Sequence, residues 1–304
     1  MTPGEPVTPR RPTTLARVGR WLLVAAALVV AFVAYQQWGT ALAHWQGQRD
    51  LRSRFDQALS RSRSEHRAGN PPPPAYPGVG DPVGIIVIPR IGLDQVIVEG
   101  VGADQLAVGP GHYPGTPLPG QPGNAAIAGH RTTHGAPFNG LAELQRGDPI
   151  EITTLQGHFT YLVTGSEVVS PDDGAVLDAT TTSQLTLTTC TPKYSAAQRL
   201  IVVARLVTPA APATPIPAAD RSATVAGADP VDSPGTWLVL VGASLALAGL
   251  YAAVRAVRRR PSRPHRPAGR DRLARLAPWL AVPVGLVLLY VAFAALDTLL
   301  PASF

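Results

Sequence analysis

Cys190 is the only cysteine among the 304 residues, and it is the side chain best suited to covalent chemistry. A single cysteine cannot form an intramolecular disulfide, so the thiol is either an inert buried group or a nucleophile. It ends the run 184–190 (QLTLTTC), in which strand alternation directs Leu185 and Leu187 toward a core. Cys190 therefore falls on the opposite, threonine-rich face, and this position favours a reactive thiol.

A nucleophilic thiol needs a base nearby, because a free cysteine has a pKa of about 8.5 and is only slightly ionised at neutral pH. His130 is the best placed of the seven histidines, since it ends the apolar run 124–130 (NAAIAGH) as Cys190 ends its own run. Side chains at the ends of neighbouring strands can meet at one rim of a barrel. His112 and His134 remain alternatives to His130 at this point.

Attack of a thiolate on a carbonyl also needs a group that stabilises the oxyanion. Arg199 follows Cys190 by nine residues and begins the next apolar run, so a hairpin can bring its guanidinium over the thiol. Its fixed positive charge also favours a nearby thiolate. Arg205 is a weaker candidate, because six strand residues carry it about 20 Å away.

The sequence predicts no metal site and no cofactor. His130 and His134 are four residues apart, but they lie in a Gly- and Thr-rich segment without an acidic partner or a second cysteine. Asp172 and Asp173 belong to a Ser-Pro-Asp-Asp-Gly segment that is typical of a turn. The Gly-rich stretches lack the strand-to-helix context of phosphate-binding loops and are also interpreted as turns.

Short β-strands must position the candidate residues. Seven β-branched or alternating runs, separated by Gly, Pro, Asn and Asp, occupy residues 84–88, 96–101, 125–128, 149–154, 159–164, 184–189 and 200–207. Seven or eight strands at this spacing predict a mainly β domain, either a small closed barrel or a sandwich. Residues 137–144 are compatible with one or two helical turns, and no long helix is expected inside the domain.

Three apolar runs outside the β-region resemble membrane-spanning helices, which need about 20 residues. They cover residues 21–38, 237–254 and 277–296, and arginine-rich segments precede the first run and separate the other two. By the positive-inside rule both arginine-rich segments are cytoplasmic, which places the β-domain outside a multi-pass cell membrane protein. Two alternatives remain open: a signal peptide cleaved at Ala41-Leu42-Ala43, and a buried helical hairpin for the second and third runs.

The stretch between the first apolar run and the β-domain allows two interpretations. Leu51 and Phe55 recur at helical spacing, which suggests a short amphipathic helix, but a solvated stalk is the preferred interpretation. In chain order we expect a cytoplasmic segment (1–20), a membrane helix (21–38), an extracytoplasmic stalk and Pro-rich linker (39–82), the β-domain (83–208), an Ala/Pro-rich linker (209–236), a membrane helix (237–254), an Arg-rich cytoplasmic loop (255–276), a membrane helix (277–296) and an extracytoplasmic C-terminus (297–304).

The placement of charge argues against nucleic-acid binding. The net charge is +6, and of the 26 basic residues only Lys193 is a lysine. The arginines gather at the ends of apolar runs, whereas a nucleic-acid binder carries basic residues over a folded face, interleaved with aromatic side chains. The 32 prolines and 29 glycines are too many for one compact core, so part of the chain is linker.

Three separated motifs resemble those of the sortases of Gram-positive bacteria. They are NAAIAGHR at 124–131, TLTTC at 186–190 and RLIV at 199–202, in this order after a membrane anchor. Two further segments, 109–116 (GPGHYPGT) and 130–138 (HRTTHGAPF), are most similar to the class E sortases of actinobacteria. The resemblance covers about residues 84–207 and implies an eight-stranded sortase β-barrel with short helices.

The resemblance also implies a transpeptidation. Cys190 would attack the Thr-Gly bond of a C-terminal sorting signal of the LAXTG or LPXTG type, His130 would protonate the leaving amine and deprotonate the incoming one, and Arg199 would stabilise the oxyanion. Thr189 matches a position that lines the substrate groove, and Tyr113 a position associated with the LAXTG signal. The implied partners are surface proteins with such a signal, an amine of a peptidoglycan precursor, and the lipid bilayer.

The sequence departs from a simple sortase in two ways. The two C-terminal apolar runs exceed what a single anchor needs, and the sequence shows no calcium-binding acid cluster of the kind that some class A sortases carry. Asp81-Pro82 resembles the lid motif of pilus-building sortases, but it lacks the aromatic residue that follows it there and is interpreted as linker. Two other functions fit the same residues: a hydrolase that passes the acyl group to water, and a non-catalytic membrane-tethered binding module in which Cys190 is inert.

Overall fold

A computed structural model describes residues 39–67, 75–193 and 195–217, with short helical pieces between 27 and 35, between 239 and 252, and from 283 to 294. Within these ranges no helix combines the length and the apolar character that crossing a bilayer requires. The predicted span 21–38 lies largely outside the described residues, and the predicted spans 237–254 and 277–296 are described only in part. The predicted segments 1–20, 255–276 and 297–304 lie wholly outside them.

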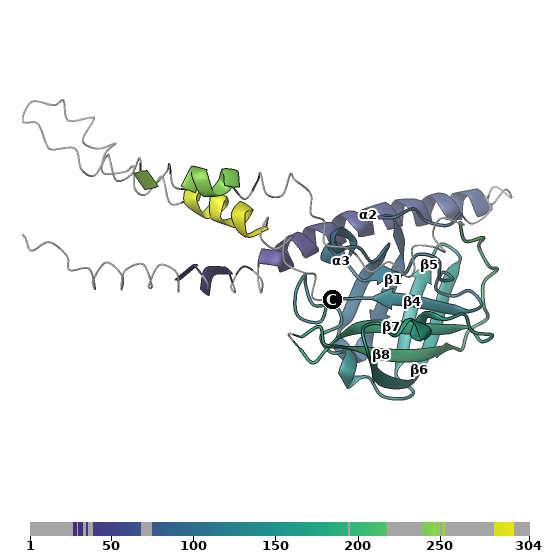
Figure 1. The fold of residues 1–304 in the computed structure, drawn as a ribbon. Coiled ribbons are helices and arrows are strands. Elements are labelled where there is room, and N and C mark those ends of the chain that lie inside the picture. The colour runs from purple at the N-terminus through teal and green to yellow at the C-terminus, as the bar shows by residue number, and fades with distance from the viewer. Residues whose placement is uncertain are drawn as a thin grey trace, which may run out of the picture.

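Eight strands form a closed barrel in the order β1-β2-β3-β4-β7-β8-β6-β5 (Figure 1). The strands are β1 (Pro82–Ile88), β2 (Leu93–Glu99), β3 (Gly111–His112), β4 (Asn124–Ala128), β5 (Pro149–Thr154), β6 (Gly157–Val169), β7 (Gln184–Thr191) and β8 (Gln198–Leu206). The pairs β2–β3 and β4–β7 are parallel, and the other neighbours are antiparallel. The prediction of a mainly β fold is confirmed, and the barrel alternative holds.

The barrel core follows the period-two alternation that the sequence shows. Ile86 and Ile88 of β1 and Ile150 and Ile152 of β5 point inward and are fully buried. Tyr161 of β6 is also fully buried, and its hydroxyl accepts a hydrogen bond from Gly120 N at 2.6 Å, which satisfies the polar end of the ring. Burial raises the pKa of this phenol to about 12. These side chains belong to one continuous apolar cluster that fills the barrel.

Two strands differ from the predicted runs for local reasons. β3 was not predicted, because its two residues lie between glycines and prolines and show no alternation; it forms by pairing Gly111 and His112 with β2 and β4. β6 continues five residues past the predicted end at 164. A register shift between Val163 and Gly165 acts as a bulge, so the strand bends and pairing with β8 resumes at Gly165.

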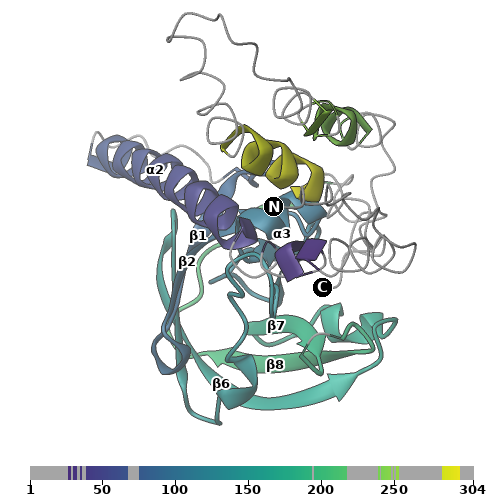
Figure 2. The same cartoon turned by 90° about the vertical axis from the view of Figure 1, so that its left-hand side faces the viewer.

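Helix α2 (Thr40–Arg67) corrects the interpretation of residues 39–82 as a solvated stalk and linker. Over its 28 residues it lies on the outside of the barrel against β1, β2 and the short helix α3 (Ala103–Val108), as Figure 2 shows. Leu51 and Phe55, one turn apart, are buried in this contact. The Gln48 side chain donates to Val96 O at 3.0 Å and accepts from Val96 N at 2.7 Å, so it fixes the helix to the edge of β2.

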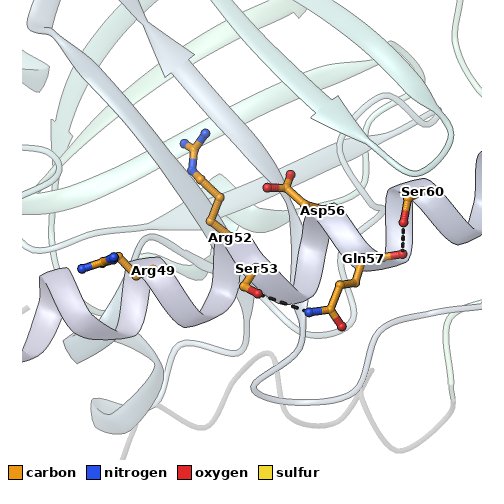
Figure 3. A pocket seen from close by; sticks show the side chains of 6 residues that line it. All are labelled: Arg49, Arg52, Ser53, Asp56, Gln57 and Ser60. Atoms are coloured by element: carbon orange, nitrogen blue, oxygen red, sulfur yellow. Dashed lines mark hydrogen bonds between the residues drawn. The ribbon is translucent and has the colours of Figure 1, made fainter.

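The solvent side of α2 carries a shallow polar depression of about 550 Å³ (Figure 3). Its lining is entirely helical side chains: Arg49, Arg52, Ser53, Asp56, Gln57 and Ser60. Gln57 Nε2 donates to Ser53 Oγ at 3.2 Å, and the Arg52 guanidinium pairs with Asp94 of β2. The depression is lined by no cysteine or histidine, so it contains neither the candidate thiol nor a candidate imidazole base.

Shorter segments complete the fold. The predicted helical stretch 137–144 contains one 3-10 turn, η3 (Leu141–Glu143), and the turn η4 (Gly174–Leu177) lies in the β6–β7 connection. After β8, the beginning of the predicted linker 209–236 packs on the barrel. Ala211 N donates to Gly120 O at 2.8 Å, and Thr214 N donates to Gln121 Oε1 at 3.1 Å.

Candidate active site

The β7–β8 hairpin brings Arg199 opposite Cys190. The two residues are directly paired in the antiparallel register, and Arg199 Nη1 lies 3.5 Å from Cys190 Sγ. The same Nη1 donates to Ala196 O at 3.1 Å, which holds the guanidinium on the hairpin turn. The hairpin anticipated from the nine-residue spacing therefore exists, and it places a fixed positive charge at the thiol.

The parallel pairing of β4 with β7 brings His130 level with Cys190. Ala128 pairs with Thr188, and beyond this pair Gly129 N donates to Thr188 O at 3.1 Å while Thr189 Oγ1 donates to Gly129 O at 2.7 Å. If this register is continued by two residues, His130 lies opposite Cys190 on the adjacent segment of the chain, at the usual interstrand spacing of about 4.8 Å. Both side chains are 5% exposed.

The loop after β4 surrounds His130. Thr133 Oγ1 lies 3.4 Å from His130 Nδ1, and the imidazole of His134 stacks on that of His130 with 4.8 Å between ring centroids. Phe138 N donates to His130 O at 3.0 Å and closes the loop. His134 thus supports the ring of His130 instead of replacing it next to the thiol.

His112 is excluded as the base because both of its ring nitrogens are used within the fold. Nδ1 lies 2.7 Å from Glu99 Oε2, and Nε2 donates to Pro117 O at 3.0 Å. His112 is fully buried, and Glu99 is 1% exposed. The pair binds β2 to β3 and leaves no nitrogen to receive the proton of Cys190.

Arg131 is a second cation at the thiol that the sequence analysis did not single out. Its Nη1 donates to Cys190 O at 2.9 Å, and the side chain is buried. A signal was present, because the residue directly follows His130 and the β4–β7 pairing must place it near Cys190. Without a predicted β4–β7 register, Arg131 could not be distinguished from a surface arginine.

Burial and charge act in opposite directions on Cys190. Desolvation is the larger effect and raises the pKa of the thiol, while Arg199 and then Arg131 lower it. The net direction is upward, so the resting side chain is the neutral thiol at neutral pH. Ionisation therefore has to accompany substrate binding or transfer of the proton to a neighbouring base.

A cavity of about 480 Å³ lies beside the thiol on the outer face of the sheet. Arg199 lines it, as do Tyr113, Thr188 and Thr189. Tyr113 Oη is 3.2 Å from Thr188 Oγ1, and burial raises the pKa of this phenol, so it stays neutral. Because the hydroxyl of Thr189 is bonded to Gly129 O, this residue contributes shape to the cavity more than a free polar group.

The opposite wall of the cavity is the β6–β7 connection, held in place by Asn124. Its Nδ2 donates to Val176 O at 3.0 Å and to Asp178 O at 3.1 Å, and its Oδ1 accepts from Thr186 Oγ1 at 2.7 Å. The sequence pattern identifies Asn124 only as the first residue of a predicted strand. The structure shows that it ties the wall to the strand that carries Cys190.

Comparison with known proteins agrees with this geometry. The sortase domain model matches residues 86–207. Sortase SrtE1 of Streptomyces coelicolor is 32% identical over 210 residues, which are 62% of this chain and 56% of the relative, so the chain spans little more than half of that protein. Sortase D of Bacillus subtilis is 35% identical over 136 residues, 43% of this chain and 67% of the relative.

Among solved structures, a sortase D5 transpeptidase of Clostridium perfringens is 32% identical, with a TM-score of 0.46, 55% of this chain covered and 99% of that chain. The residues that the family model matches include the strands that carry Cys190 and Arg199 and the position of His130. The chain belongs to the sortase family of cysteine transpeptidases.

Proposed function

We propose that the chain is a membrane-anchored sortase that cleaves a C-terminal sorting signal between Thr and Gly and transfers the protein to a cell-wall amine. The observation that carries the proposal is the 3.5 Å distance between Arg199 Nη1 and Cys190 Sγ. The parallel pairing of β4 with β7, whose ends lead to His130 and Cys190, and the cavity that Arg199 lines support it. A nucleophile, a proton carrier and a cation are the three groups that acyl transfer through a thioester requires.

In the first half-reaction, Cys190 Sγ forms a bond to the threonine carbonyl carbon of the signal, and the C–N bond to glycine breaks. His130 takes the proton of the Cys190 thiol as Sγ attacks and passes it to the leaving amine, and the acyl group remains on sulfur as a thioester. Arg199 Nη1, already 3.5 Å from Sγ, lies where negative charge develops on the carbonyl oxygen. The raised pKa of Cys190 implies that substrate binding precedes or accompanies formation of the thiolate.

In the second half-reaction, an incoming amine attacks the thioester carbon and loses a proton to His130, which returns it to sulfur as the C–S bond breaks and the Cys190 thiol is restored. The peptide bond lost in the first step is thereby replaced by a new amide. The acceptor in this proposal is an amine of a peptidoglycan precursor. Water is the competing acceptor, and its use would make the protein a hydrolase.

The cavity supports recognition of a short extended peptide. Tyr113 and Thr188 present a neutral polar pair on a wall that includes the apolar side chains of Leu106 and Ile201. The charged residues of the lining are Arg199 and, on the β6–β7 connection, Asp172, Asp173 and Asp178. The apolar part of this lining suits small and apolar side chains, as in Leu-Ala-x-Thr-Gly or Leu-Pro-x-Thr-Gly. We assign the Ala or Pro position of the signal to the neighbourhood of Tyr113.

Membrane anchoring is supported by the apolar runs and by the described helical pieces outside the barrel. Leu245, Tyr251 and Val287 on these pieces are each more than 60% exposed, which is unusual for large apolar side chains in water. Tyr35 and Tyr290 pack edge to face with 5.2 Å between ring centroids, so N-terminal and C-terminal pieces contact each other. Bilayer contact for these surfaces accords with the arginine-rich flanks.

Mass spectrometry of the full-length protein mixed with Leu-Ala-x-Thr-Gly or Leu-Pro-x-Thr-Gly peptides tests the proposal. We expect an acyl adduct on Cys190 and, with an added amine, a transpeptidation product. His158→Ala, at an exposed histidine of β6, serves as a control for the loss expected in Cys190→Ala. No adduct with either peptide would favour the binding module, and hydrolysis alone in the presence of amine would favour the hydrolase.

A further inference from the structure

The first turns of α2 contact the loop that follows His130. Thr40 is 2% exposed, and its Oγ1 accepts a hydrogen bond from His134 N at 3.3 Å. His44, one turn farther along the helix, is 5% exposed, and its ring lies against the backbone of Gly135. A Cβ added to Gly135 would collide with this ring, so the loop and the helix are in close contact. The start of α2 therefore supports two consecutive positions of the loop.

The backbone of this loop is in an unfavourable conformation. His134 has φ 49° and Ala136 has φ 44°, both in the left-handed region that residues with a Cβ rarely adopt. Gly135 between them has φ 72°. Inside the loop, Ala136 N donates to Thr133 O at 2.8 Å. A strained segment keeps such a conformation when surrounding contacts hold it, and the contacts from Thr40 and His44 are of this kind.

The strained segment carries the ring that supports the proposed proton carrier. His134 stacks on His130 with 26° between the ring planes. His130 Nδ1 also lies 3.4 Å from Thr133 Oγ1, a long and therefore weak hydrogen bond, so the stacked ring of His134 contributes to the orientation of the imidazole. A general acid has to lie within hydrogen-bonding reach of the reacting atoms, so small rotations of this ring matter.

His44 is itself fixed on the barrel side. Its Nδ1 lies 3.3 Å from Ala107 O in α3, and Gln48 next to it donates to Val108 O at 2.8 Å. Burial lowers the pKa of His44, an effect that its contacts with Ala107 and Gln95 oppose and that the nearby His134 reinforces. The ring is thus a neutral, immobile part of the helix–barrel contact.

We propose that Thr40 and His44 are positioning residues for the transpeptidation: through His134 they hold the imidazole of His130 in its reactive orientation. Helix α2 is then a component of the active site in addition to a connection toward the membrane. The inference rests on the proposed function, because it takes His130 as the proton carrier.

Kinetics of the full-length protein with a sorting-signal peptide and an amine test this assignment. We expect Thr40→Val and His44→Ala to lower kcat about tenfold, since small misplacement of a catalytic group costs up to about 100-fold. KM should be unchanged, because Tyr113, Thr188 and the cavity wall are untouched. Thr40→Ser keeps the hydroxyl and should retain the activity of the unmodified protein. His134→Ala should lower kcat about as much as Thr40→Val does. The double variant Thr40→Val/His134→Ala should lose little more kcat than either single variant, because both changes act through the same ring.

Trp45→Ala is the matched control, because Trp45 lies on the same turn of α2 but is 54% exposed. Its kcat should equal that of the unmodified protein. Urea midpoints and the yield of Cys190 acyl adduct identify folded, competent protein, and kcat is expressed per competent molecule. Loss of kcat by Thr40→Val with retention by Thr40→Ser supports the assignment even if His44→Ala fails to fold.

Two results would overturn the inference while the proposed function stands. One is full kcat in Thr40→Val and His134→Ala when His130→Ala is inactive. The other is equal loss in Thr40→Ser and Thr40→Val, which would show that the hydroxyl plays no part. By contrast, absence of a Cys190 adduct in the unmodified protein would overturn the proposed function and this inference together.

Discussion

His112 and His130 are both almost completely buried, and both lie at the ends of short neighbouring strands, β3 and β4. His112 faces Glu99 on one side and a backbone carbonyl on the other, so its two nitrogens are committed to the fold. His130 lies instead beside a thiol, next to a second imidazole. Burial and strand position are thus shared, and the neighbours alone separate a structural histidine from a reactive one.

The comparison fails if the two histidines prove interchangeable in function. We expect His130→Ala to lower kcat for transpeptidation by about 100- to 10,000-fold, the range found when a general acid or base is removed. The urea midpoint should change less than in His112→Ala, because only the latter variant leaves the buried Glu99 carboxylate without its histidine partner. Steady-state kinetics and urea unfolding on the same preparation check both statements. A variant that loses stability but keeps its rate would assign His130 a structural role.

The opposite result is expected for His112. Its replacement by alanine leaves the Glu99 carboxylate buried without a partner, which costs about 3–5 kcal/mol of unfolding free energy. The folded fraction should still form the Cys190 adduct, with a far smaller loss of kcat than His130→Ala. Urea unfolding measures the first effect and single-turnover adduct formation the second. An unchanged midpoint would contradict the buried pair.

Asn124 holds the β6–β7 connection that forms one wall of the cavity, so its replacement tests peptide binding separately from catalysis. Asn124→Ala removes three hydrogen bonds, two of them to the β6–β7 connection, at a cost of about 1–3 kcal/mol in stability. We expect KM for the signal peptide to rise severalfold with kcat nearly unchanged, because Cys190, His130 and Arg199 keep their positions. A fall in kcat at constant KM would mean that the wall positions the reacting groups.

Arg199 and Arg131 should affect the pKa of the Cys190 thiol in the same direction and differ only in the size of the effect. Arg199 and Arg131 both lower the pKa of the thiol against the larger effect of burial. Arg199→Met or Arg131→Met should therefore raise the pKa further and slow alkylation by iodoacetamide about three- to tenfold at pH 8, with Arg199→Met the slower. The rate of the unmodified protein should rise with pH, since the thiolate becomes populated only above the ordinary pKa of cysteine. A flat pH profile would contradict the raised pKa.

Much of the fold was predictable because strand alternation is local. The inward positions of Leu185 and Leu187, the outward position of Cys190 and the mainly β class follow from period-two patterns in the sequence, whereas these patterns left both a barrel and a sandwich open. Helix α2 was underestimated, since Leu51 and Phe55 are the apolar members of its buried residues and they stand among many arginines and serines. Its docking depends on Gln48 and on the edge of β2, a tertiary surface that no window of sequence contains.

Sequence patterns alone predict that the single thiol, Cys190, ends a strand on its polar face. They also predict that His130 ends another strand and that Arg199 begins a third. The tertiary structure adds the parallel pairing of β4 with β7, whose register brings His130 and Arg131 to the thiol. It also adds the contact between His112 and Glu99, which no sequence pattern indicates. The reason is physical: alternation fixes which face a residue occupies, whereas the partner of each strand depends on how the whole barrel closes.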